Sequence, residues 1–141
     1  MKNVIKSIAI FIFFLSCNGN ENFPIVHEDY YVKVEAFYKF NNSDELYPDG
    51  SSDVFVYYGI QSLDIVGFNI DEKGKLIKDN KEILPNKYIK TSAEGKCMFM
   101  SDNLDEHVTF IIVSHQFKEL LAINSFYNSR TQIEIKSVVA N

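Results

Sequence analysis

The sequence is poor in the residues that carry chemistry. Among 141 residues there is no tryptophan, and there are only two cysteines and three histidines, His27, His107 and His115. No Gly-x-Ser-x-Gly, His-Glu-x-x-His or Cys-x-x-Cys motif is present, nor is a glycine loop that would cradle phosphate. A hydrolase needs a nucleophile within reach of a base, or two facing carboxylates. We therefore predict that the protein is not an enzyme and uses no cofactor or metal.

Clusters of basic residues are also missing. The 14 basic and 19 acidic residues give a net charge of −5, which becomes −7 if Lys2 and Lys6 leave with a cleaved signal. Binding to nucleic acid depends mainly on neutralising phosphates, so a nucleic-acid partner is not expected. A basic patch that would hold the chain on a membrane surface is not expected either.

The N-terminus is typical of a secretory signal. Two lysines lie within the first six residues, and an apolar run follows over positions 8–15. That run is well short of the roughly 20 residues that cross a bilayer as a helix. Residues 1–16 are therefore predicted to be a helical signal peptide and not part of the mature fold.

The signal ends in Phe14-Leu15-Ser16-Cys17, which resembles the lipobox of bacterial lipoproteins. The resemblance implies cleavage before Cys17 and attachment of two or three acyl chains to that residue, enough for stable anchoring. An ordinary cleaved signal and an uncleaved anchor are the alternatives. Asn18 is not the aspartate that retains many lipoproteins at the inner membrane, so the outer membrane is favoured and its face stays open.

Residues 17–29 are predicted to form a flexible tether, and residues 30–141 one folded domain. With Cys17 committed to lipid, Cys97 has no partner within the chain. In a run of alternating character, a free cysteine is expected to pack as a small hydrophobe. An intermolecular disulfide and a reactive nucleophile are the alternatives.

The body of the chain has the period-two pattern of strands. Residues 32–40 alternate apolar and polar, which predicts a strand with one wet face, and 53–60 are apolar on both faces, which predicts a central strand. Two hairpins are predicted, 65–77 turning at Gly74 and 88–100 turning at 93–95. With strands near 108–115, 120–127 and 131–138, about seven strands indicate an all-β sandwich or barrel.

A family resemblance favours the sandwich. The stretch 91–99 has the spacing Thr91-x-x-x-Gly95-Lys96-x-x-Phe99, and residues 108–118 follow with an apolar strand and a basic turn. These motifs resemble the carboxypeptidase regulatory-like domains, which have the prealbumin (transthyretin-like) fold. The resemblance implies a single antiparallel, prealbumin- or Ig-like β-sandwich that acts as an accessory, adhesive or assembly module. The hydroxyisourate-hydrolysing branch is not expected, because its His/Arg/His set and C-terminal motif are missing.

The tyrosines are the remaining candidates for binding. Tandem Tyr30-Tyr31 and Tyr57-Tyr58 must send neighbouring rings to opposite faces of a strand. Tyr31 and Tyr58 are therefore candidate contacts, with amphipathic rings at the margin of the core as the alternative. Acidic loops at 49–53 and 102–106 offer oxygen ligands for Ca²⁺ but lack EF-hand spacing.

These observations predict a lipid-anchored lipoprotein of the cell envelope that acts by binding, adhesion or assembly on a protein or glycan partner. The alternative is a ligand-binding or hydrolytic protein with a pocket near His107 or His115. An exposed apolar or aromatic patch would favour the first hypothesis. A deep pocket with convergent polar groups would favour the second.

Overall fold

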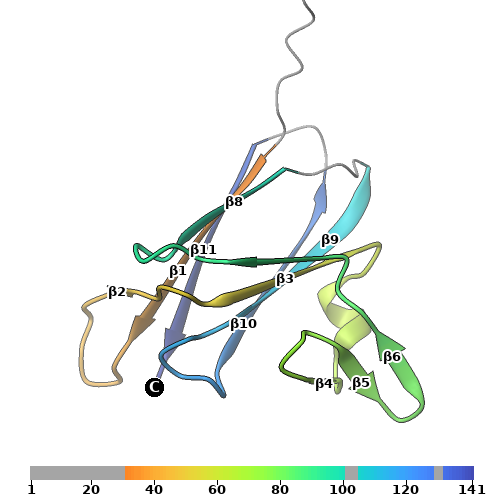
Figure 1. Ribbon diagram of the computed structural model, residues 1–141, viewed down its shortest axis with the longest axis horizontal. Coiled ribbons are helices and arrows are strands. Elements are labelled where there is room, and N and C mark those ends of the chain that lie inside the picture. Colours follow the sequence, from red (N-terminus) through yellow and green to blue (C-terminus); the bar gives the residue numbers. More distant parts are fainter. Residues whose placement is uncertain (1–30, 101–104, 129–131) are drawn as a thin grey trace, which may run out of the picture.

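The computed structural model describes residues 31–100, 105–128 and 132–141 (Figure 1). The predicted signal peptide, lipidated Cys17 and tether lie outside these residues, as do His27, Tyr30 and positions 102–104. No helix within the described ranges is long and apolar enough to cross a membrane.

The first sheet is built around strand β1. Its members are β1 (Tyr31–Lys39), β2 (Tyr47–Pro48), β8 (Lys96–Met100) and β11 (Ile133–Ala140). Strand β11 pairs with β1 in parallel, while β2 and β8 pair with β1 antiparallel. The predicted alternation of β1 is confirmed at Val32, Val34 and Ala36, which are buried, whereas Phe40 is exposed.

The second sheet packs against the first. It runs in the order β10 (Leu121–Asn128), β9 (Glu106–Val113), β3 (Asp53–Tyr58) and β7 (Lys87–Lys90), and all its pairs are antiparallel. The core between the two sheets draws on both. Its buried members are Val32, Val34, Ala36, Phe99 and Ile135 from the first sheet, and Val54, Val56, Val108, Phe110 and Ile112 from the second. The predicted all-β sandwich is confirmed, although the parallel pair of β1 and β11 departs from the antiparallel arrangement that was predicted.

A third layer covers the outer face of the second sheet. It consists of the 3₁₀ turn η1 (Ser62–Ile65) and the small sheet β4 (Asn69–Ile70), β5 (Leu76–Lys78) and β6 (Lys81–Ile83). A second apolar cluster lies beneath it, formed by Phe55, Tyr57, Ile65, Leu76 and Ile111. Strand β3 is therefore central and buried on both faces, as its sequence predicts.

The number of long strands agrees with the prediction, since within residues 31–100, 105–128 and 132–141 seven strands have four or more residues and four are shorter. The first hairpin is confirmed between β4 and β5, with Gly74 at a φ of 79°, although the predicted first strand begins only at Asn69. The second hairpin is wrong. Gly95 does turn the chain, with a φ of 72°, but β7 joins the second sheet and β8 the first. Long-range pairing with β3 and β1 overrides the pairing of neighbours.

Candidate functional site

Four aromatic side chains gather where β1 ends, and we call this group the aromatic end. It consists of Tyr38, Phe40, Tyr47 and Phe117. Tyr38 stacks on Tyr47 with ring centroids 5.4 Å apart and lies edge-on to Phe117 at 5.6 Å. Phe40 lies edge-on to Tyr38 at 5.8 Å and to Phe117 at 5.7 Å. Such pairs add to the stabilisation from buried area, so the rings hold one another in place.

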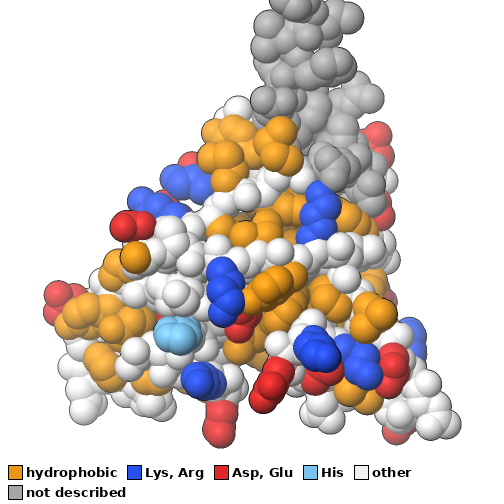
Figure 2. Space-filling model, viewed as in Figure 1, with side chains coloured by type: hydrophobic (Ala, Val, Ile, Leu, Met, Phe, Trp, Pro, Cys, Tyr) orange, Lys and Arg blue, Asp and Glu red, His pale blue; other side chains and the backbone are white. Residues whose placement is uncertain are grey.

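The aromatic end is partly open to solvent. Phe40 is 45 % exposed, and the other three rings are half-buried. Leu46, which precedes Tyr47 in the chain, is also exposed. Figure 1 labels β1 and β2. Figure 2 shows hydrophobic side chains gathered over the connection between these two strands. At roughly 3.3 Å per residue, the nine residues of β1 place this group ~25 Å from Tyr31, where the chain enters the sandwich.

A buried carboxylate holds the loop that carries Phe117. Asp49 is almost completely buried and accepts hydrogen bonds from Ser114 Oγ and from the backbone N–H groups of His115 and Gln116, the latter two at 3.2 Å. Ser114 Oγ in turn accepts from the N–H of Phe117 at 2.9 Å. Because Asp49 follows β2, this network ties the β9–β10 loop to the segment that bears Tyr47.

Thr91 and Gly95, two residues of the family-like motif, fix the same region. Thr91 Oγ1 donates to the Asp49 carbonyl at 2.8 Å and accepts from the N–H of Ser52 at 2.9 Å. A Cβ on Gly95 would lie 2.4 Å from the carbonyl oxygen of Ala36, so a larger residue does not fit. Both motif residues therefore position backbone and leave no group free for chemistry.

Tyr47 brings a polar group to the edge of the aromatic end. Its hydroxyl donates to Glu45 at 2.6 Å, and this hydrogen bond raises the pKa of the Tyr47 phenol. The proton of the hydroxyl is therefore held by Glu45, and the phenol oxygen can still accept a hydrogen bond. A partner meeting this end finds ring surfaces with a carboxylate and a hydroxyl at their border.

The two tyrosines predicted as contacts lie elsewhere. Tyr31 begins β1, is half-buried and donates to Gln132 Oε1 at 3.1 Å. Tyr58 ends β3 and packs against the core between the sheets, with its ring 6.3 Å from Phe99. As predicted for a tandem pair, Tyr57 points to the opposite face and is fully buried in the outer cluster. The structure does not bring Tyr31 and Tyr58 into one site, and their role in binding stays a prediction.

The two described histidines are separated by the length of β9. His107 lies near its start, edge-on to the ring of Tyr127 at 5.2 Å, and His115 lies beyond its end. His115 lines a cleft of about 530 Å³, shared with Asp53, Phe55, Asp71, Lys90 and Lys118 among others. His115 therefore lines a cavity, whereas His107 contacts an aromatic ring.

Three of the charged groups that line the His115 cleft, Asp53, Asp71 and Lys90, contact neighbouring residues. Asp53 forms an ion pair with Lys90 at 3.1 Å and accepts from the hydroxyl of Tyr88 at 2.7 Å. These hydrogen bonds raise the pKa of Tyr88 and the pKa of Lys90. Asp71 accepts from the N–H groups of Lys73 and Lys75 at 2.9 and 2.8 Å. The Asp53 contacts join β3 to β7, and the Asp71 contacts close the turn between β4 and β5.

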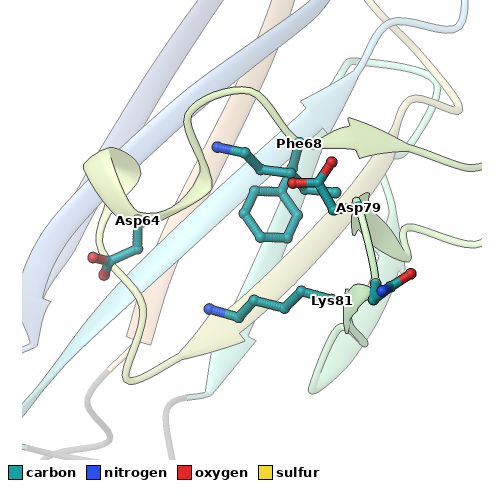
Figure 3. A pocket seen from close by; sticks show the side chains of 6 residues that line it. Asp64, Phe68, Asp79 and Lys81 are labelled. Carbon is teal, nitrogen blue, oxygen red and sulfur yellow. The ribbon is translucent and has the colours of Figure 1, made fainter.

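A second hollow, of about 580 Å³, lies in the third layer around Phe68 (Figure 3). The ammonium groups of Lys78 and Lys81 each lie 5.7 Å from the Phe68 ring centroid, and Asp64 and Asp79 border the same space. Lys78 also donates to the carbonyl of Val66 at 3.0 Å. The charged side chains at this hollow are all exposed, as in a solvated turn.

Metal-binding and thiol chemistry find little support in the described ranges. No group of three His, Cys, Asp or Glu side chains comes together there as a metal site requires. Of the predicted acidic loops, 49–53 has its Asp49 carboxylate engaged, and 102–106 lies mostly outside the described residues. Cys97 packs at the core margin, as predicted, and burial raises the pKa of its thiol to about 11, which disfavours the nucleophilic thiolate.

The sequence analysis missed the aromatic end because its members come from three separate segments. Tyr38 and Phe40 continue the alternation of β1 and were expected to be buried, and Tyr47 lies in a stretch rich in turn residues. The sequence pattern places Phe117 only in the basic turn that follows the apolar strand 108–115. One feature of the sequence does indicate an exposed ring here: the alternating run 32–40 ends on an aromatic residue, and the polar stretch 41–45 follows it directly.

Comparisons with known proteins assign no family. No family model matches the chain, and no curated protein is significantly similar to it. The resemblance to carboxypeptidase regulatory-like domains stays a prediction.

Proposed function

We propose that this chain is a non-catalytic binding module, held on the cell envelope by lipid on Cys17, that contacts an envelope protein or glycan through the aromatic end. The observation that carries the proposal is the position of this group. The rings lie at the end of β1, whereas the chain that leads from Cys17 enters at its beginning. An anchor at one end leaves the other end free for a partner.

The chemistry of the aromatic end supports this role. Aromatic rings bring a large apolar area with few rotatable bonds, so little side-chain entropy is lost on binding. The rings of Tyr38, Phe40 and Phe117 already fix one another through edge-on contacts of 5.6–5.8 Å. The Asp49 network holds the loop behind them. A preorganised surface of this kind binds without first being ordered.

The first experiment tests the anchor. Intact mass and membrane fractionation are measured for the native protein and for Cys17→Ala. Lipidation predicts an acyl-sized mass increment and recovery with membranes for the native protein only. If both forms are unlipidated and soluble, the anchor is wrong and the protein is a secreted domain.

The second experiment tests the contact surface. A photo-crosslinking amino acid is placed at Phe40 in one variant and at the exposed Leu84, in the third layer, in a matched control. We expect adducts to envelope protein or glycan from position 40 in intact cells, and few from position 84. Equal labelling from both positions, or none from position 40, would contradict a binding role for the aromatic end.

A further inference from the structure

The open edges of the two main sheets differ in how they are protected. Unpaired strand edges are templates for another strand, and proteins usually blunt them with charge, proline or short length. Strand β11 carries Glu134 and Lys136, and β7 begins and ends with lysine. Strand β8, which pairs only with β1 within the described residues, begins with a lysine, and β2 has two residues, one of them proline. Strand β10 has none of these devices.

Strand β10 is long, uncharged and apolar on its outer side. Its eight residues, Leu121–Asn128, contain no charged residue, proline or glycine. It lies at the edge of its sheet, and only β9 pairs with it within the described residues. Leu121 and Ile123 are 40 % and 44 % exposed, and Tyr127 is exposed as well.

The apolar surface continues from β10 onto the third layer. The N–H of Ser62 donates to Ser125 Oγ at 3.3 Å, which places η1 beside β10. The next residue, Leu63, is 79 % exposed, and Val66 is also exposed. The edge of β10 is therefore flanked by further apolar side chains that lack cover from described residues.

We propose that β10 pairs with β10 of a second copy of this chain, so that two molecules form a dimer with one continuous eight-stranded sheet. Across a two-fold axis a strand meets itself antiparallel, and residues on it oppose residues of the same strand. Because β10 has no charged residue, this pairing places no two like charges opposite each other. Pairing of β11 or β7 with itself would bring several charged side chains into the contact.

A single strand pair needs flanking residues to reach the area of a stable interface. Stable interfaces bury roughly 1,200–2,000 Å² in total. Leu63 follows Ser62, which contacts β10, and Val66 is the C-cap of the same 3₁₀ turn; both are exposed and would extend the contact on the outer face of the sheet. The inner side of β10 is tied to the first sheet by a hydrogen bond from Asn124 Nδ2 to Ser137 Oγ at 2.7 Å, so the strand is held in place. This inference does not depend on the lipid at Cys17 or on the aromatic end.

The test is the mass of the native protein in detergent micelles, measured by light scattering coupled to size exclusion and corrected for detergent. We expect the native protein to be a dimer and Ile123→Lys to be a monomer, because lysine on an edge strand blocks pairing. Val138→Lys is the matched control, since Val138 is an equally exposed residue (40 %) on β11. It should remain a dimer.

Leu121→Lys provides a second variant on β10 in case Ile123→Lys does not give a native circular dichroism spectrum. A monomeric native protein at all accessible concentrations would overturn the proposal. A folded β10 variant that stays dimeric would overturn it too, as would loss of the dimer in Val138→Lys alone.

Discussion

The two apolar clusters of this protein are built differently. The cluster between the main sheets draws on long strands from both ends of the chain, with β1 and β11 side by side in parallel. The outer cluster is closed by the segment between β3 and β7, whose strands have two or three residues each. The first holds the sandwich together. The second covers one face of β3 and β9 with a locally folded layer, which is expected to open more easily.

The largest effect is expected in the cluster between the sheets. Phe110 is fully buried there and packs against Phe99 and Phe126. Phe110→Ala should lower the free energy of unfolding by about 3–5 kcal/mol, because it removes buried area and leaves a cavity. Urea denaturation measures the loss. A change below about 1 kcal/mol would mean that this cluster does not hold the sandwich together.

A smaller and more local effect is expected in the outer cluster. Leu76 is buried beneath the third layer. Leu76→Ala should lower the free energy of unfolding by about 2–3 kcal/mol. Hydrogen exchange should rise in β4, β5 and β6, while the amides of β1 and β9 keep most of their protection. If protection falls equally in all strands, the two clusters form one cooperative unit and the distinction between them fails.

The polar network behind the aromatic end should matter less to stability than either cluster. Asp49→Ala leaves the N–H groups of His115 and Gln116 and the hydroxyl of Ser114 without their acceptor. The free energy of unfolding should fall by about 1–3 kcal/mol. The amides of His115 and Gln116 should then exchange faster. Asp49→Asn, which keeps one oxygen acceptor, is the control and should retain part of the protection.

The smallest effect is expected on the charged outer face of the first sheet. Lys33 lies 3.1 Å from Glu35, and its hydrogen bond lowers the pKa of the Glu35 carboxyl below the ordinary value of 4.5. A carboxyl with a lowered folded pKa stabilises the fold above its unfolded pKa, and this contribution is lost as the pH falls through the folded value. Lys33→Met should flatten the acid limb of the stability profile slightly, as thermal melts between pH 7 and pH 3 would show. An unchanged profile would mean that the pair is fully screened by solvent.

Much of the fold could be predicted from local pattern. The alternation of Val32, Val34 and Ala36 and the doubly apolar run of β3 appear in the structure as predicted. The positive φ angles of Gly74 and Gly95 also follow from turn chemistry. The failed hairpin at 88–100 shows the limit, because a turn signal states that the chain bends and does not state which strand it meets next.

By itself the sequence determined that this is a small all-β protein with a central strand buried on both faces, because period two and turn residues are local properties of the chain. Only the tertiary structure decided that β11 lies parallel to β1 and that a third layer covers the second sheet. It also decided that Tyr38, Phe40, Tyr47 and Phe117 meet at one end, and that β10 is left as an uncharged edge. These features depend on contacts between residues far apart in the chain, which a local pattern does not encode.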